Sequence, residues 1–383
     1  MKILLAPDSF KGSATSSEVV SAMEEGIKRI IPDVEIMKAP LSDGGEGMSM
    51  ILTEKLNGII KRVEVTGPLG EKIKSYYGLI EDGNTAVMDV ASVIGLPLVP
   101  KEKRNPLLTN TEGVGELICE ILKENVEKVI IGLGGSSTVD GGTGLAHRLG
   151  IIFYSNEKKL ERMSGGVLNE ITRTDISNLH PKVKSTRFIG ACDVSNPLLG
   201  ENGAAKVYGP QKGATPEQVM FLENGLTNLS KKIKECIGKN VSEIKGAGAA
   251  GGLGAGLVAF LDAELWSGIE LVMEKLGVER MIKYADIIFT GEGKFDNQTL
   301  SGKAVNGILK LALKYNKSVL LIAGIIDPYL KKSDIKGISG MESLVSKNIS
   351  EKESMQNTRK LISDASEKLL INLMKHRNNL LKN

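Results

Sequence analysis

The chain has 383 residues, and its 49 basic and 46 acidic side chains leave a formal net charge of only +3. Because there is no excess of positive charge and only 4% of the residues are aromatic, a nucleic-acid partner is not expected. No apolar stretch reaches the roughly 18 residues of a membrane span, and Pro7 and Asp8 interrupt the apolar run at the start, so neither a membrane partner nor a signal peptide is expected.

The first residues predict a strand, a helix and a second strand. Residues 3–6 form a short buried strand, apolar residues recur at helical spacing over 16–31 after a cap at Ser16 or Ser17, and 34–37 is the second strand. Lys11 lies in the loop after the first strand, and Asp43 opens the sequence D-G-G-E-G after the second. Polar loops at strand ends are where α/β proteins bind ligands.

The pattern changes after residue 58. Three segments, 61–65, 73–79 and 85–90, are separated by the turn sequences G-P-L-G and E-D-G-N, which are typical of an antiparallel meander. A helix over 111–122 follows, and the β-branched run 129–131 then predicts a strand buried on both faces. A second domain or subdomain therefore begins in this region.

Residues 132–144, G-L-G-G-S-S-T-V-D-G-G-T-G, continue from that strand as a loop with six glycines. Without Cβ atoms the backbone N–H groups can turn toward a ligand, and three hydroxyl side chains stand beside Asp140. A helix that begins near Thr143 would add its N-terminal N–H groups, which favour a phosphate. The pattern predicts an anion-binding loop, and the alternative is a glycine-rich connection with only a folding role.

A second glycine segment, 246–251, reads G-A-G-A-A-G. It follows predicted strands at 151–154 and 187–191 and a helix over 216–237 capped by Thr215. The residues directly before it make a poor buried strand, so the context that a dinucleotide-binding motif requires is missing. We favour a tight glycine contact surface that opens a helix over 253–261.

The C-terminal part repeats the pattern of the first residues. The expected elements are a helix over 269–276, a strand over 285–290, a helix over 304–315, a strand over 318–323 and a closing helix over 358–374. Since the two ends of the chain share this organisation and the middle does not, residues 1–65 and 284–383 are expected to form one discontinuous α/β domain. A second α/β domain, 66–283, is inserted into it, and we expect the ligand cleft between the two.

Charged residues follow several of the predicted strands. Four acids and three lysines stand in such loops, with Lys294 as a weaker candidate: Asp43, Asp140, Asp193, Asp296, Lys11, Lys212 and Lys303. Carboxylates that hold Mg²⁺, lysines that neutralise phosphate and glycine loops that bind its oxygens are the parts that phosphoryl transfer requires. The chain lacks the P-loop sequence and the protein-kinase motifs. For each acid alone, a helix cap or an Asx-turn is the alternative.

Long motifs occur in order over nearly the whole chain. They include A-P-D-S-F-K-G at 6–12, P-L-S-D-G-G-E-G at 40–47, G-G-S-S-T-V-D-G-G at 134–142, C-D-V-S-N-P-L at 192–198, G-P-Q-K-G-A-T-P at 209–216 and G-E-G-K-F-D-N-Q-T-L-S-G-K at 291–303. In this respect the sequence resembles the bacterial glycerate kinase family of the first class. It departs at Val139, where an Asn is common, which puts a ligand role for that position in doubt, and at Asp89, where a Glu is usual.

The resemblance implies ATP-dependent phosphorylation of D-glycerate with Mg²⁺, carried out by a flavodoxin-like parallel-sheet domain and a second α/β domain. It also implies transfer to the secondary hydroxyl, which gives 2-phosphoglycerate. Transfer to the primary hydroxyl, which gives 3-phosphoglycerate, and action on a related small hydroxy acid are the alternatives. ATP and glycerate are the expected partners, and monomer and homodimer are both left open.

The site roles are inferred from residue chemistry. Asp43 and Asp296 are assigned to Mg²⁺ and to positioning the substrate hydroxyl, and Asp193 is a reserve base. Lys11 or Lys212 would contact phosphate or the glycerate carboxylate, because an unpaired carboxylate in a closed cleft is costly. The two glycine segments are assigned to ATP or the acceptor, in an order that stays open, through Gly134, Gly135, Ser136, Ser137, Asp140, Gly248, Gly251 and Gly252.

Two other classes compete with a kinase. A binding protein would keep the cleft without the chemistry, but it would need neither the carboxylates nor the loop lysines. An NAD-dependent hydroxy-acid oxidoreductase rests on 246–251 alone. Three cysteines without metal-ligand or redox spacing predict a cytoplasmic protein without disulfides.

Overall fold

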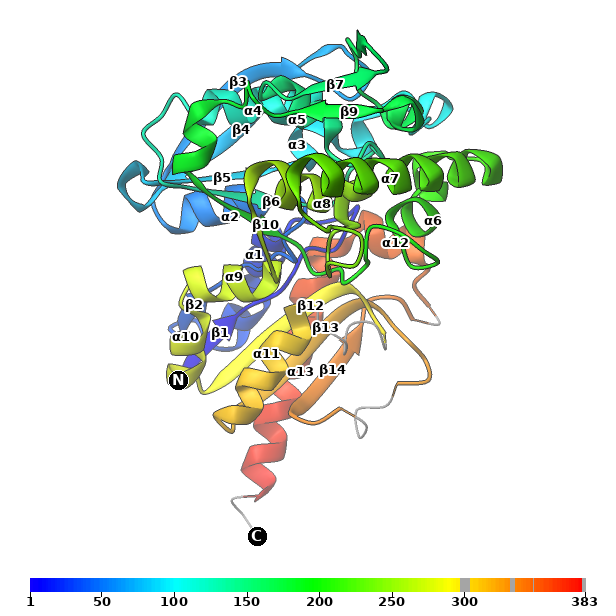
Figure 1. The fold of residues 1–383 in the computed structure, drawn as a ribbon. Helices are drawn as coiled ribbons and strands as arrows, with labels where there is room; N and C mark the ends of the chain where they lie inside the picture. Colours follow the sequence, from blue (N-terminus) through cyan, green and yellow to red (C-terminus); the bar gives the residue numbers. More distant parts are fainter. Residues whose placement is uncertain (297–303, 331–334, 347, 381–383) are drawn as a thin grey trace. The chain divides into compact units, whose positions relative to one another are not determined.

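The computed structural model describes residues 1–296, 304–330, 335–346 and 348–380, with side chains up to residue 376 in the last helix. The chain divides into two compact units (Figure 1). Unit 1 comprises Met1–Asp43 and Ile269–Asn383, and unit 2 comprises Gly44–Gly268. Both boundaries lie earlier in the chain than the crossings expected at 65/66 and 283/284.

The elements next to each boundary explain the difference. β3 (Ile59–Thr66) pairs along its whole length with β4 (Lys72–Ile80), and α2 (Met48–Lys55) packs against β4, so residues 44–66 belong to unit 2. At the second boundary, α10 (Val278–Tyr284) contacts β1 (Lys2–Leu5), an element of unit 1. The sequence interpretation followed the change from helix to strand pattern, whereas the units are defined by which elements pack together.

Unit 1 contains a parallel sheet in the order β2-β1-β12-β13-β14. The other strands are β2 (Glu35–Lys38), β12 (Ile287–Phe295), β13 (Ser318–Ile326) and β14 (Ile338–Ser343). Ile3 pairs with Ile287, so strands from the two ends of the chain are neighbours, and numbered within the unit the order is 2-1-3-4-5. In a doubly wound sheet of this order, the switch point between β1 and β12 is where ligands bind.

Helices pack on both faces of this sheet. α1 (Ser16–Ile30) and α13 (Thr358–Leu380) share a core with alternate strand residues such as Ile3 and Phe289. α10 and α11 (Ala304–Lys314) contact the same strands, and α9 (Gly268–Lys275) and α12 (Glu351–Gln356) complete the unit. The cap of α1 is Thr15, in a capping box with Glu18, and not Ser16 or Ser17 as expected.

Unit 2 contains a mixed sheet in the order β11-β10-β6-β5-β4-β3. β3, β4 and β5 (Thr85–Asp89) form the predicted antiparallel meander, and β5, β6 (Lys128–Gly132), β10 (Arg187–Ala191) and β11 (Glu264–Trp266) are parallel. A small antiparallel sheet consists of β8 (Lys158–Lys159), β7 (Ile152–Ser155) and β9 (Arg173–Asp175). The α/β class is therefore confirmed, with sheets that are mostly parallel.

The helices of unit 2 are α2, α3 (Ala91–Ile94), α4 (Glu112–Ile121), α5 (Thr143–Arg148), α6 (Ala204–Tyr208), α7 (Pro216–Ile237) and α8 (Ala249–Leu261). Thr215 caps α7, as predicted, and the structure adds a capping box with Gln218. In α8 the backbone of residues 250–252 has positive φ, so regular helix begins at Leu253, where the sequence predicted it.

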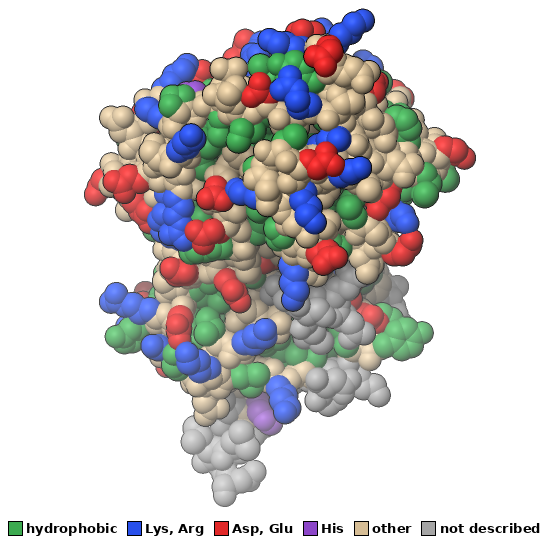
Figure 2. All heavy atoms as spheres, in the orientation of Figure 1, with side chains coloured by type: hydrophobic (Ala, Val, Ile, Leu, Met, Phe, Trp, Pro, Cys, Tyr) green, Lys and Arg blue, Asp and Glu red, His purple; other side chains and the backbone are tan. Residues whose placement is uncertain are grey.

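The charged side chains follow the expectation from composition. On the face shown in Figure 2, basic and acidic side chains of the described residues are interspersed. Among the described residues, no helix combines the length and apolar character needed to cross a bilayer.

Candidate active site

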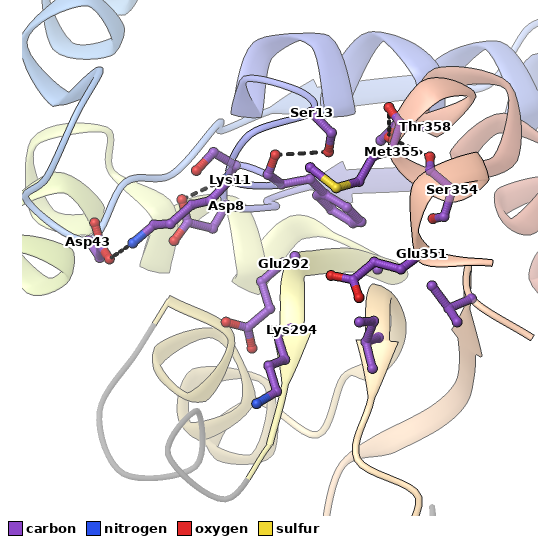
Figure 3. A pocket seen from close by; sticks show the side chains of 16 residues that line it. Asp8, Lys11, Ser13, Asp43, Glu292, Lys294, Glu351, Ser354, Met355 and Thr358 are labelled. Carbon is purple, nitrogen blue, oxygen red and sulfur yellow. Dashed lines mark hydrogen bonds and ion pairs between the residues drawn. The ribbon is translucent and has the colours of Figure 1, made fainter. Parts of the chain in front are cut away.

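A cavity of about 270 Å³ lies in unit 1 at the carboxyl ends of the parallel strands (Figure 3). Its wall consists of the loop after β1, Asp43 after β2, residues 292–294 of β12, residues 324–325 of β13, and parts of α12 and α13. The cavity is therefore at the switch point between β1 and β12, where a doubly wound sheet binds ligands.

Two of the predicted residues form an ion pair at this cavity. Lys11 Nζ donates to Asp43 Oδ2 at 2.9 Å, and the Lys11 side chain is 76% exposed (Figure 3). An exposed pair of this kind contributes only ~0–1 kcal/mol, so a bound ligand can replace it at little cost. Asp296 forms a similar pair, 3.3 Å between its Oδ2 and Nζ of Lys294, which lines the cavity. The structure thus places Lys11, Asp43 and Asp296 in the same unit.

Three acids at the cavity, Asp8, Glu292 and Glu351, were missed as site residues. Asp8 is only 7% exposed, and burial, with the negative charges of Asp43 and Glu292, raises its pKa to about 7 although the Ser9 N–H donates to its Oδ1. Asp8 follows a predicted strand as the chosen acids do, so the same signal could have identified it. Glu292 also follows directly on the strand expected to end at 290, so the same signal could have identified it, although in the structure it lies within β12, which continues to Phe295.

Magnesium fits the chemistry of this cavity. Among the described residues, no three His, Cys, Asp or Glu side chains are grouped closely enough to hold a metal ion by themselves. Mg²⁺ usually takes one or two protein carboxylates and completes its shell with phosphate oxygens and water, so Asp43 could hold it there; Asp296 pairs with the lining residue Lys294 but is not itself among the residues that line the cavity. The role of Asp43 and Asp296 as metal ligands stays a prediction.

In unit 2, the carboxylate of Asp140 is hydrogen-bonded to neighbouring residues of the chain. It is fully buried, and its carboxylate accepts hydrogen bonds from the backbone and hydroxyl of Thr111 at 2.9 and 2.8 Å and from the N–H groups of Gly142 and Gly144. Burial raises its pKa despite these bonds. Asp140 therefore ties the glycine loop to the start of α4, which is the capping role left open as the alternative.

Lys212 is also buried, at 4% exposure. Its ammonium donates to Ser136 Oγ at 2.9 Å and to the carbonyl oxygen of Thr138 at 2.7 Å. Burial lowers its pKa to about 7, and the Asp140 charge opposes this. The buried ammonium of Lys212 is hydrogen-bonded to the glycine loop 132–144. This geometry gives no support to the contact with phosphate or glycerate that the sequence assigned to Lys212.

The two glycine segments pack against each other. The Gly141 N–H donates to the Gly251 carbonyl, and a Cβ at Gly251 would overlap the Thr138 carbonyl oxygen. Gly251 and Gly252 have φ of +69° and +87°, which also favours glycine. The glycine contact surface predicted for 246–251 is confirmed. A Cβ at Gly248 would similarly overlap the Pro197 carbonyl, whereas Gly134 and Gly135 are more exposed.

The remaining predicted residues have simpler positions. Asp193 follows β10 in unit 2 and accepts a hydrogen bond from Ser267 Oγ at 2.7 Å. Ser137 is buried and donates to the Ile94 carbonyl oxygen at 2.9 Å. Lys303 lies outside the described residues. The role of Asp193 as reserve base stays a prediction.

Comparison with known proteins identifies the family. The sequence pattern described as the Glycerate kinase family matches residues 3–374. The chain belongs to the glycerate kinase family. A protein of Halalkalibacterium halodurans named glycerate kinase is 43% identical over 96% of this chain and 97% of that protein. Glycerate 2-kinase of Escherichia coli K12 is 44% identical over 85% of each.

A solved structure supports the same conclusion for the fold. A crystal structure of a protein from Salmonella typhimurium LT2, provisionally named glycerate kinase 2, covers 99% of both chains with a TM-score of 0.85 and 38% identity. The mixed α/β fold described above is therefore that of a glycerate kinase family member.

The two departures from the family pattern have structural explanations. Val139 is fully buried in the core of unit 2, so that position does not offer a side chain to a ligand. Asp89 is also buried and caps α2 by accepting hydrogen bonds from the Gly47 N–H and from the N–H and hydroxyl of Ser49. In this glycerate kinase family member both positions serve the packing of unit 2.

Proposed function

We propose that the chain transfers the γ-phosphoryl group of ATP to D-glycerate, with 2-phosphoglycerate and ADP as products. The observation that carries this proposal is the family membership together with the 44% identity to a relative named glycerate 2-kinase. The site in unit 1 has the residue types that the reaction needs, which are carboxylates and lysines at the ends of parallel strands.

The lysines and the carboxylates of the site have different roles in the proposed reaction. Lys11 and Lys294 would neutralise phosphate oxygens, and Asp43 and Asp296 would hold Mg²⁺, which supplies further positive charge when bound. The secondary hydroxyl oxygen of glycerate forms the new bond to phosphorus, ADP leaves, and the hydroxyl proton passes to a carboxylate. Asp43 or Asp296 is proposed as that carboxylate, with Asp193 in reserve.

We also propose that unit 1 is flavodoxin-like. The support is its parallel strand order of 2-1-3-4-5, which is the order of that doubly wound fold. The expectations that the reactants meet between the two parts of the chain, that the protein is cytoplasmic, and that it is a monomer or homodimer stay predictions.

The product distinguishes the two possible acceptors. Phosphorus NMR of the product formed from ATP and D-glycerate should give a doublet, because the phosphate of 2-phosphoglycerate couples to one proton. A triplet would show transfer to the primary hydroxyl and contradict the assigned position while leaving the kinase activity intact.

A parallel assay tests the reaction class. ADP should form with glycerate and ATP, and no reduced cofactor should form when NAD replaces ATP. If neither reaction occurs in a folded protein, the chain is a binding protein and the proposed function is wrong.

A further inference from the structure

The cavity in unit 1 has two chemically different ends. Lys11 and Asp43 lie at one end, and Met355, Ser354 and Glu351 lie toward the other, with Glu292 between them (Figure 3). Besides Met355, the lining includes three apolar side chains, Phe10, Ile325 and Val345. A ligand that fits the whole cavity therefore has a charged part and an apolar part.

The charged lining disfavours a bare anion. Four acids, Asp8, Asp43, Glu292 and Glu351, line the cavity against two lysines, Lys11 and Lys294. A small carboxylate that enters alone would meet more negative than positive charge, and like charges repel strongly where water is partly excluded. A polyphosphate that arrives with a divalent cation brings positive charge to these acids and negative charge to the lysines.

The apolar end disfavours glycerate for a second reason. Glycerate carries an oxygen on every carbon, so it has no apolar face with which to cover Phe10, Ile325, Val345 and Met355. Removing apolar surface from water stabilises a complex by roughly 25 cal/mol per Å², and a flat heterocyclic base supplies the matching surface.

Two glycines bring backbone close to this space. Gly324 and Gly293 line the cavity without side chains, and the Gly324 Cβ position would overlap the Gly293 carbonyl oxygen, so the strands β12 and β13 lie close together there. Because these two lining residues have no side chains, they leave room in the cavity for a planar ring or a chain of phosphates.

We propose that the nucleotide binds in this cavity of unit 1, with its base against Phe10, Ile325, Val345 and Met355 and its phosphates toward Lys11 and Lys294. The proposal rests on the proposed function for its choice of nucleotide. It removes the nucleotide from the two glycine segments of unit 2, where Gly141, Gly142, Gly251 and Gly252 are explained by the packing of one segment against the other.

Substitution of Met355 tests the apolar end. Met355 is 45% exposed, so a polar side chain there should not unfold the protein. Met355→Glu and the uncharged Met355→Gln should both weaken binding of ADP with excess Mg²⁺, by at least about 10-fold and about 3-fold respectively, and Met355→Leu should retain it. Calorimetry should show unchanged D-glycerate binding in all three. The matched control is Met220→Glu on α7, since Met220 is 53% exposed and does not line the cavity.

The outcomes separate the alternatives. Loss of glycerate binding with unchanged ADP binding would make the cavity the acceptor site and overturn the proposal. If Met355→Glu weakens ADP binding and Met355→Gln does not, ADP binding responds only to charge at this position. The base then does not contact Met355, and the proposal is overturned.

A measurement on the unmodified protein avoids any dependence on variant folding. In hydrogen exchange, ADP with Mg²⁺ should protect the backbone around residues 343–358, and glycerate alone should not. The reverse pattern, or protection by neither, would overturn the proposal. Failure of the proposed function is visible separately, because the unmodified protein would then bind ADP at this cavity but form no phosphoglycerate.

Discussion

Units 1 and 2 both have charged side chains after the ends of their strands, but some of these side chains border a cavity in unit 1 and others are buried in unit 2. In unit 1, Lys11 and Asp43 form an exposed pair beside a cavity. In unit 2, Asp140 and Lys212 are buried, and their hydrogen bonds go to the backbone and hydroxyl groups of neighbouring loops. The same local pattern, a charged residue in a glycine-rich loop after a strand, therefore has two outcomes.

The difference teaches how to interpret such loops. A buried charge with complete hydrogen bonds contributes to the shape of a loop, and its removal affects stability first. An exposed charge at a cavity contributes little to stability, so its removal affects binding or catalysis first. The three predictions below test this contrast.

The largest effect is expected in the glycine contact of unit 2. Gly251→Ala should lower the free energy of unfolding by roughly 3–5 kcal/mol, because the methyl group overlaps the Thr138 carbonyl and the backbone is left-handed. Urea denaturation measures the change. Gly200→Ala is the control, since Gly200 also has a positive φ but open space at its Cβ position, and only ~1–2 kcal/mol is expected. Equal losses in both variants would refute the packing explanation.

The second effect concerns activity in unit 1. Asp43→Asn and Asp296→Asn should each lower turnover with glycerate and ATP at least about 100-fold, because each substitution removes a charge assigned to the metal or the hydroxyl. Stability should hardly change, as measured in the same denaturation experiment. Asp33→Asn is a matched control, because Asp33 is an exposed acid before β2 that does not line the cavity. Normal turnover in both folded variants would reject the assignment.

The smallest effect is a pH dependence. Burial lowers the pKa of Lys212 to about 7 from its ordinary 10.5, so between these values the unfolded chain binds more protons than the folded one. The stability of the unmodified protein should therefore rise with pH from about 7 to 9, by up to about 1.4 kcal/mol per pH unit from this group.

Two variants isolate that contribution. Lys212→Met should lack the rise when unfolding is followed at several pH values. Lys11→Met should retain it, because desolvation of Lys11 is outweighed by the charge of Asp43, which raises its pKa above this window. An identical pH profile in the unmodified protein and Lys212→Met would mean that Lys212 titrates normally.

Local patterns predicted much of the fold. The antiparallel meander, the Thr215 cap and the start of regular helix at Leu253 all depend on neighbouring residues, and all are confirmed. The boundaries of the two units were harder to locate, because 44–58 joins unit 2 through the contacts of α2 with β4 and β5. Such contacts leave no periodic signal in the segment itself.

The site shows the same limit. Asp43 and Lys11 were selected from the sequence, and the structure pairs them. Asp8 was passed over although it follows its strand as the chosen acids follow theirs, and only the structure shows that it is buried at the same cavity. Lys212 was selected as a ligand contact because its loop resembles the others.

The sequence by itself determined the family, the α/β class and the charged residues that follow the strands, since motifs and periodicity are properties of consecutive residues. Only the tertiary structure decided which of those residues border a cavity and which are buried. Burial depends on contacts between distant segments: the ammonium of Lys212 bonds Ser136, 76 residues away, and Asp140 bonds Thr111, 29 residues away. The folded chain brings these partners together, and that removes Lys212 and Asp140 from water while Lys11 stays in it.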